Sequence, residues 1–269
     1  MLHEQEATLT AADGIAISAV HVPSPVDRGD LAFVVVHGFT GSWRQDRVRK
    51  VISRLVLRGG VVALDLRGHG RSGGVTTLGD AEVMDVAAAV EWARELGYAH
   101  VVTVGFSLGG AVVLREAALS AGTPAQVDAV VSVSAPAFWF YRGTRIMRIA
   151  HWMVETVPGR SLMRLRGTRI SSRAWTRPYP VAPVEAASRL PGIPLLVIHG
   201  DADHYFPLEH PHAIIEAARS ATSRADLWIE QGFAHAESSI PVPVIDRLGV
   251  WAVSACAEDA PMQEQREAG

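Results

Sequence analysis

Continuous apolar runs alternate along the chain with segments of helical periodicity. The runs cover residues 31–38, 60–68, 100–107, 127–135 and 193–200. Strands buried on both faces give such runs, because neither face meets water. Between the runs lie segments such as 81–96, where one helical stripe consists of Val83, Val86, Ala87 and Val90. Strands that alternate with helices predict a parallel sheet with right-handed crossovers.

The two ends of the pattern differ from its middle. Residues 7–23 alternate apolar and polar positions around Asp13-Gly14, a strong hairpin signal, so an antiparallel pair is expected first. Residues 225–231 predict the last strand, and residues 243–257 predict a C-terminal helix. The predicted fold class is α/β, with a mostly parallel central sheet, flanking helices, an antiparallel N-terminal hairpin and one helical insertion.

The insertion is predicted where the alternation stops. Residues 137–190 are rich in aromatic residues and arginine, contain several prolines and glycines, and show no strand signal. Such a segment is too long for an ordinary loop. We therefore expect residues 1–136 and 191–258 to form one core, residues 137–190 to form an insertion, and residues 259–269 to form a disordered tail.

Composition and charge narrow the class of protein. The chain has 269 residues, 48% of them hydrophobic and 20% charged, with a net charge of −3, as in ordinary globular proteins. The total charge gives no reason to expect a nucleic acid partner. Cys256 is the one cysteine, so no internal disulfide can form. Neither a secretory leader nor an apolar window of about 18 residues is visible, so we expect no integral membrane segment and a cytoplasmic location.

One serine lies in a tight bend between a buried strand and a helix. Ser107 is the centre of "GFSLGG", residues 105–110, with β-branched residues before it and helix formers after it. Small neighbours allow a sharp strand-to-helix turn that holds the hydroxyl clear of the sheet, as a nucleophile requires. The alternatives are an incidental serine or a phosphate-binding turn, but a P-loop places lysine after its last glycine, where Ala111 stands.

A serine nucleophile needs a base and a carboxylate at the same edge of the sheet. His235 follows the last predicted strand and is the candidate base. His37 and His199 also follow strands, but each precedes a glycine and is expected to fix its loop by hydrogen bonding. Asp201 and Asp203 both follow the 193–200 strand, and their spacing alone does not decide which one orients the histidine. The backbone N–H of Leu108, at a helix N-terminus, would stabilise the oxyanion.

Five stretches carry a family resemblance: "VVVHGFTGS", "LDLRGHGRSG", "GFSLGG", "HGDADHYFP" and "FAHAE". In this order the chain resembles α/β-hydrolase-fold serine hydrolases, in the branch of small esterases, monoacylglycerol-lipase-like enzymes and related peptidases. The resemblance implies that Asp203 is the acid, that Phe39 supplies the second oxyanion donor, and that residues 137–190 form the cap. The chain departs from the family at Ala234, where glycine is frequent. The "DLRGHGRSG" loop, residues 65–73, is expected to be structural.

The predicted function is a serine hydrolase, carboxylesterase-like or lipase-like, that cleaves a small-molecule carboxylic ester or thioester through an acyl-enzyme. One alternative is an acyltransferase or perhydrolase on the same triad, and another is a non-catalytic binding protein on this fold. No metal is expected, because "HYFPLEHPH" has three histidines without zinc-site spacing and is interpreted as a solvated loop. No cofactor is expected either, since no dinucleotide fingerprint is present.

The insertion has a charge of its own. Residues 137–180 hold nine arginines against one acid, Glu155, which gives this segment +8 and the remainder of the chain −11. Its aromatic residues include the candidate substrate contacts Phe138, Trp139 and Trp152. One interpretation is a solvated arginine face over an apolar underside. The other is attraction of an anionic substrate or an anionic lipid surface, through arginines such as Arg142, Arg145 and Arg148. Nothing in the sequence indicates an oligomeric state.

Overall fold

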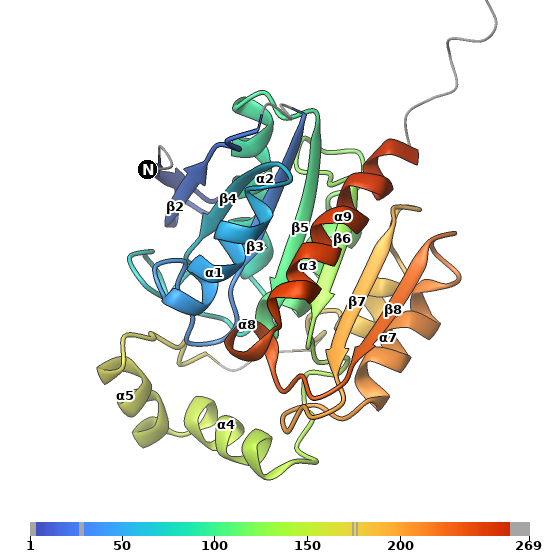
Figure 1. Cartoon of the computed structure of the whole chain (residues 1–269). Helices are drawn as coiled ribbons and strands as arrows, with labels where there is room; N and C mark the ends of the chain where they lie inside the picture. Colours follow the sequence, from blue (N-terminus) through green and yellow to red (C-terminus); the bar gives the residue numbers. More distant parts are fainter. Residues whose placement is uncertain (1–3, 27–29, 174, 176, 259–269) are drawn as a thin grey trace, which may run out of the picture.

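The central element is an eight-stranded sheet in a computed structural model that describes residues 4–26, 30–173, 175 and 177–258 (Figure 1). The strand order is β1-β2-β4-β3-β5-β6-β7-β8. β1 and β2 are antiparallel, β2 is antiparallel to β4, and all further neighbours are parallel, as predicted. The bounds are Gln5–Thr10, Ala16–Val22, Leu31–Val36, Gly60–Leu64, His100–Phe106, Ala129–Val133, Leu195–Gly200 and Ala225–Glu230 for β1 to β8.

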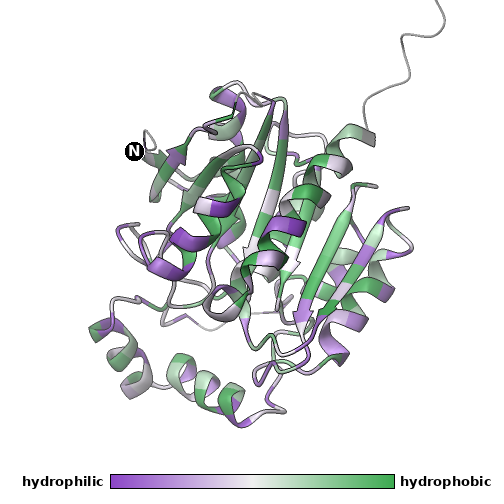
Figure 2. Ribbon diagram, viewed as in Figure 1, coloured by the Kyte–Doolittle hydropathy of each residue, from purple (hydrophilic) through white to green (hydrophobic). Residues whose placement is uncertain are grey.

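Helices cover both faces of this sheet. One face carries α1 (Asp46–Leu55), α8 (Ala236–Ser239) and α9 (Val242–Glu258), and the other carries α2 (Glu82–Glu95), α3 (Leu108–Leu119), α6 (Pro183–Ala187) and α7 (Glu209–Ala218). A separate apolar core fills each interface, and Figure 2 shows the strands largely hydrophobic. Val34, Val35 and Val36 of β3 are fully buried, and each such side chain contributes roughly 1.5 to 3 kcal/mol on burial.

The buried face of α2 differs from the predicted stripe. Val86 and Val90 are buried as expected, but Val83 and Ala87 are only half-buried. The buried face also includes the acids Glu82 and Asp85, which periodicity cannot assign to a core. Both carboxylates are buried because neighbouring loops donate hydrogen bonds to them, as Thr77 and Gly79 do to Glu82 and Arg67 does to Asp85.

Helices α4 (Arg145–Glu155) and α5 (Val157–Leu165) lie apart from the sheet, beyond the carboxyl ends of its parallel strands (Figure 1). Each begins at a threonine whose hydroxyl accepts a backbone N–H: Thr144 from Met147, and Thr156 from Gly159. The division into core and insertion stays a prediction, and the predicted tail, residues 259–269, falls outside the described residues. None of the helices in the described ranges is both long and apolar enough to cross a membrane.

Candidate active site

Ser107 occupies a strained bend at the junction of β5 and α3. Its backbone has φ 51° and ψ −115°, a conformation that L-residues rarely adopt and that is found mainly at functional sites. The turn brings α3 so close to β3 that a Cβ at Gly109 would overlap the carbonyl oxygen of Val36. Glycine is therefore required here, and the Ser107 side chain lies at the N-terminus of α3, facing a cavity.

The structure brings Ser107, His235 and Asp203 together from the ends of β5, β8 and β7. The Ser107 hydroxyl lies 3.0 Å from Nε2 of His235, and Nδ1 of His235 lies 2.7 Å from Oδ2 of Asp203. The tautomer that satisfies both contacts carries its proton on Nδ1, which donates to Asp203, while Nε2 accepts from Ser107. This chain of contacts has the order that a general base and its orienting carboxylate require.

The two candidate acids have different surroundings. The Asp203 side chain is 1% exposed, and its Oδ1 accepts the N–H groups of Tyr205 and Phe206 at 2.7 and 3.2 Å. Asp201 is exposed, and its Oδ1 accepts the N–H of Gly232 at 2.6 Å. This donor to Asp201 belongs to the turn after β8. The geometry favours Asp203 as the partner of His235.

Three side chains that sequence reasoning missed hold His235 in place. Ser239 accepts the N–H of His235 at 2.7 Å, and Ser134 accepts the N–H of Ala236 at 3.1 Å. The ring of Tyr205 stacks on the imidazole, with ring centroids 4.0 Å apart and planes inclined by 19°. Tyr205 lies two residues after Asp203 in the quoted "HGDADHYFP" stretch, but nothing in that stretch shows which way its ring points.

Both candidate oxyanion donors line the cavity next to Ser107. The N–H groups of Phe39 and Leu108 donate no hydrogen bond to another residue in the described part of the chain. The loop before Phe39 approaches the nucleophile closely, since a Cβ at Gly38 would lie 3.2 Å from Cβ of Ser107. The buried carboxylate of Glu237 accepts the Gly38 N–H at 3.2 Å and holds this loop. Sequence reasoning did not assign Glu237 a role.

The histidines set aside in the sequence fix loops. Nδ1 of His37 donates to the Gly38 carbonyl at 2.7 Å, and Nε2 accepts the Leu66 N–H at 3.0 Å. Burial lowers the pKa of His37 to about 3, so its ring is neutral at physiological pH. Nε2 of His199 lies 2.9 Å from the Phe206 carbonyl, and burial lowers the pKa of this ring too.

The interpretation of residues 204–212 as a solvated loop holds for the exposed His204 and Tyr205 but is wrong for residues 209–212. Helix α7 begins at Glu209, and His210 is 1% exposed. Its Nδ1 accepts the N–H of Ala137 at 2.9 Å, and burial lowers its pKa to about 4. This neutral ring ties α7 to the start of the 137–190 segment. Proline at position 211 is compatible with this helix because the first turn requires no intrahelical N–H donor.

The 65–73 loop ties its neighbours together, as expected. Oδ1 of the buried Asp65 accepts the hydroxyl of Ser42 at 2.7 Å and the N–H of Trp43 at 2.9 Å. The guanidinium of Arg67 pairs with Asp85 at 2.7 Å and with Asp13 at 2.6 Å. Burial lowers its pKa, but the hydrogen bonds that it donates to both carboxylates outweigh this effect and raise the pKa.

A cavity of about 930 Å³ extends from Ser107 beneath α4. The candidate contacts Phe138 and Trp139 line it, but Trp152 does not, although all three lie in the described ranges. Successive residues of a helix point about 100° apart. His151 and Met153 both line the cavity, so Trp152 between them points to the opposite side of α4, toward solvent. The arginines on the wall are Arg47, Arg160 and Arg173, and the last two belong to the nine arginines of residues 137–180. Arg142, Arg145 and Arg148 do not line it.

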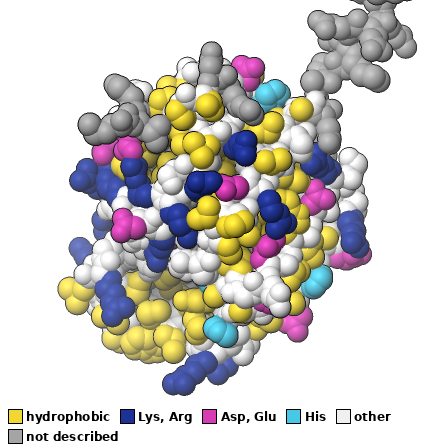
Figure 3. Space-filling view, viewed as in Figure 1, with side chains coloured by type: hydrophobic (Ala, Val, Ile, Leu, Met, Phe, Trp, Pro, Cys, Tyr) yellow, Lys and Arg dark blue, Asp and Glu magenta, His cyan; other side chains and the backbone are white. Residues whose placement is uncertain are grey.

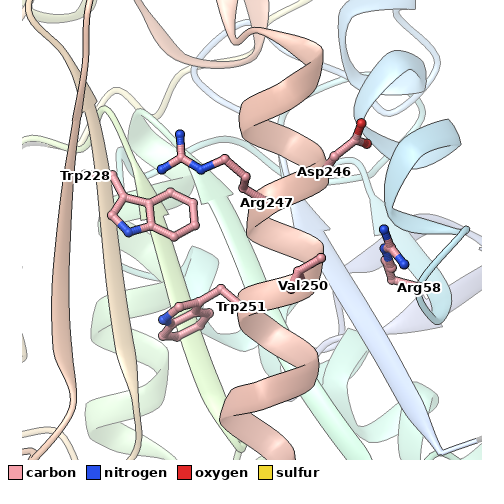
Figure 4. A pocket seen from close by; sticks show the side chains of 6 residues that line it. All are labelled: Arg58, Trp228, Asp246, Arg247, Val250 and Trp251. Carbon is pink, nitrogen blue, oxygen red and sulfur yellow. The ribbon is translucent and has the colours of Figure 1, made fainter.

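A second, shallow groove of about 400 Å³ lies on the outer side of α9 (Figure 4). The guanidinium of Arg247 lies 4.4 Å from the ring centre of Trp228, a residue of the edge strand β8. Trp251 donates its indole N–H to Asp226 at 2.6 Å. None of the predicted site residues lines this groove.

Comparisons with known proteins give the same fold. A family model described as alpha/beta hydrolase fold matches residues 32–158. A search of curated proteins finds no match. The esterase Pf2001 of Pyrococcus furiosus superposes with a TM-score of 0.73 at 20% identity, over 95% of this chain and 93% of that chain. The esterase RhEst1 of Rhodococcus sp. ECU1013 superposes with a TM-score of 0.65 at 21% identity, over 93% and 99%.

Est1E of Butyrivibrio proteoclasticus, solved with bound ferulic acid, superposes with a TM-score of 0.64 at 18% identity, over 92% of this chain and 100% of that chain. Identities of this size show the fold alone. The strand order, the antiparallel N-terminal pair and the strained bend at Ser107 agree with it. Together, the architecture and the family match identify the chain as a protein of the α/β-hydrolase fold.

Proposed function

We propose that the protein is a serine hydrolase that cleaves a carboxylic ester or thioester through an acyl-enzyme on Ser107. The observation that carries this proposal is the hydrogen-bonded chain from Ser107 through His235 to Asp203, with contacts of 3.0 and 2.7 Å at the cavity. A serine hydroxyl is unreactive at neutral pH without such a base. Two of the superposed structures, Pf2001 and RhEst1, are esterases, which supports a hydrolase.

The proposed reaction has two halves. Oγ of Ser107 attacks the carbonyl carbon while Nε2 of His235 takes the hydroxyl proton, and Asp203 stabilises the resulting imidazolium. The N–H groups of Phe39 and Leu108 donate to the oxyanion. The tetrahedral intermediate collapses when the bond to the leaving oxygen or sulfur breaks and His235 returns the proton to it. Water, activated by His235, then releases the acid in the same way.

We further propose that residues 137–190 form a cap that receives the acyl group. Trp139, Phe140, Trp175 and Tyr179 line one wall of the cavity and pack edge to face, with neighbouring ring centroids 5.2 to 5.9 Å apart. The indole N–H of Trp175 donates to the carbonyl of Thr77 at 2.9 Å, which ties this wall to the core. Such a wall suits an apolar or aromatic acyl group.

A fluorophosphonate probe tests the nucleophile directly. We expect wild-type protein to be labelled and to hydrolyse a p-nitrophenyl ester, and the Ser107→Ala variant to do neither. Equal labelling of both proteins would contradict the proposal. A folded wild type that the probe does not label would instead favour the non-catalytic binding protein.

The competing acyltransferase uses the same residues, so it needs a different measurement. Adding an alcohol acceptor to the ester assay separates the two functions by the product formed. A hydrolase gives mainly free acid, whereas predominant transfer to the alcohol would favour the acyltransferase.

A further inference from the structure

Helix α4 is apolar on two sides. Its inner side lines the cavity with Met147, Ala150 and Met153. Its outer side carries Ile149, which is 50% exposed and also reaches the cavity rim, and Trp152, which is 48% exposed. A helix at the surface of a globular protein usually has one apolar stripe, turned toward the core. The second apolar side of α4 is therefore not explained by packing within the chain.

Helix α5 continues this exposed apolar surface. Val157, Leu162 and Leu165 are 69%, 38% and 86% exposed. Figure 3 shows hydrophobic side chains gathered over α4 and α5, with basic side chains beside them. We define the α4–α5 face by its exposed apolar residues: Ile149, Trp152, Val157, Leu162 and Leu165. A contiguous exposed apolar surface of this kind marks an interaction site.

Arginines flank the α4–α5 face. Arg145, Arg148, Arg164 and Arg166 are exposed, and within the described ranges no acid pairs with any of them. The one acid of residues 137–180, Glu155, is already held by Arg142 at 2.6 Å and by His151 at 2.8 Å. The surface is therefore apolar at its centre and positive around it, which complements a surface that is apolar beneath and negative above.

We propose that the α4–α5 face docks on an anionic phospholipid bilayer. The apolar side chains enter the boundary between headgroups and acyl chains, and the arginines contact the anionic headgroups, as in helices that lie in the membrane plane without spanning it. The cavity behind α4 would then lie next to the membrane. The proposal does not depend on the hydrolase activity, because it concerns binding alone.

Vesicle sedimentation tests the docking without any turnover. Vesicles of phosphatidylcholine alone are compared with vesicles in which phosphatidylglycerol replaces part of it, at low and high salt. We expect the wild type to bind the anionic vesicles preferentially and to dissociate as salt rises. Absence of binding, or equal binding to both vesicles, would overturn the proposal.

Two double variants separate the apolar and charged parts. Val157→Ser with Leu165→Ser is expected to weaken binding about tenfold. Arg164→Gln with Arg166→Gln is expected to weaken it about fivefold per arginine. The matched control is Leu57→Ser with Leu119→Ser, which removes two exposed leucines. Leu57, 42% exposed, lies two residues after the end of α1, and Leu119, 58% exposed, is the last residue of α3.

The control variant should bind as wild type does, and all three variants should hydrolyse a dissolved short ester normally, because none of these residues lines the cavity. An equal loss of vesicle binding in the control would overturn the proposal. So would a wild-type dimer that the Val157→Ser, Leu165→Ser variant dissociates, because a second copy would then cover the face.

Discussion

Helix α3, which belongs to the core, and helix α4, which belongs to residues 137–190, differ in how much of their surface is buried. α3 buries its residues from Leu108 to Ala117 between the sheet and its neighbours, whereas α4 buries only His151. α3 carries the proposed oxyanion donor Leu108 at its first position, and packing holds the helix from Leu108 to Ala117. α4 covers the same cavity but leaves its outer side exposed. The difference fits the proposed function, in which the tightly packed core positions the reacting groups and residues 137–190 receive the substrate.

Backbone strain follows the same division. In the part of the chain that the structure describes, the non-glycine residues with positive φ are Thr40, Leu78, Ser107, Ser134 and Ala236. All but Ser134 line the cavity, and Ser134 accepts the N–H of Ala236. Strained residues persist only where the surrounding structure determines them.

The largest expected effect comes from the core. Ser107→Ala should lower kcat for a p-nitrophenyl ester by about 10⁵-fold or more, because the variant has no nucleophile. The melting temperature should change little, since the hydroxyl contributes little to packing. Retention of most of the turnover would show that another residue carries the reaction.

The two aspartates offer a matched pair for the next effect. Asp203→Asn should reduce kcat by about 10⁴-fold, because His235 loses the acceptor that selects its tautomer. Asp201→Asn should leave kcat near that of the wild type and act on the stability of the turn that holds Gly232. Kinetics of both variants decide the assignment, and the opposite ranking would make Asp201 the acid.

A buried acid in α3 makes the core sensitive to pH. Glu116 is 2% exposed, and burial raises its pKa from 4.5 to about 8. As pH rises between these values, the unfolded chain loses this proton and the folded chain keeps it, so stability falls. We expect Glu116→Gln to remove about 2 to 4 kcal/mol of this decline between about pH 5 and about pH 8.

Urea unfolding at both pH values checks this effect. The quantity to compare is the difference in free energy of unfolding between the two pH values, in wild type and in Glu116→Gln. Identical pH profiles for the two proteins would mean that Glu116 ionises normally in the folded chain.

A smaller effect on kcat is expected from Glu237, which holds the loop of Gly38 and Phe39. Glu237→Ala removes the acceptor of the Gly38 N–H and should lower kcat about tenfold with little change in KM. Glu237→Gln keeps an acceptor oxygen and should restore most of kcat. If both variants lose activity equally, the charge of Glu237, paired with Arg47 at 3.6 Å, matters more than its hydrogen bond.

The smallest effect is expected outside the core. The triple variant Arg142→Ala, Arg145→Ala, Arg148→Ala should leave kcat/KM unchanged for neutral and anionic dissolved esters of equal acyl length. None of these arginines lines the cavity, and all three are exposed, so salt screens their charges. A selective loss with the anionic ester would restore the hypothesis that these arginines attract the substrate.

The sequence predicts the core better than the segment that covers it. Strands buried on both faces give unbroken apolar runs, so β3 to β7 could be predicted from the order of apolar residues along the sequence. Ser107, His235 and Asp203 follow strand ends, and strand ends of a parallel sheet share one edge. Asp203 nevertheless required the family resemblance, because only the three-dimensional turn shows that Asp201 binds Gly232 instead.

What the sequence does not show depends on contacts between distant segments. Glu82 and Asp85 are buried because residues of neighbouring loops donate hydrogen bonds to them. The helical periodicity of α2 gives no information about the position of those loops. Trp152 is an aromatic residue of the type that often lines pockets, but its position around the axis of α4 directs it toward solvent, where it is 48% exposed. Tyr205 lies two residues from Asp203 and Glu237 lies two residues from His235, yet their contacts depend on where the chain turns.

The most direct test of the central claim is mass spectrometry of the protein quenched during turnover of a slowly deacylated ester. The account predicts one acyl group on the wild type, located on the peptide that contains Ser107, and no acyl group on His235→Gln quenched at the same time. An acyl group on a different residue, or steady turnover with no trapped acyl-enzyme and no phosphonate label at Ser107, would contradict the account.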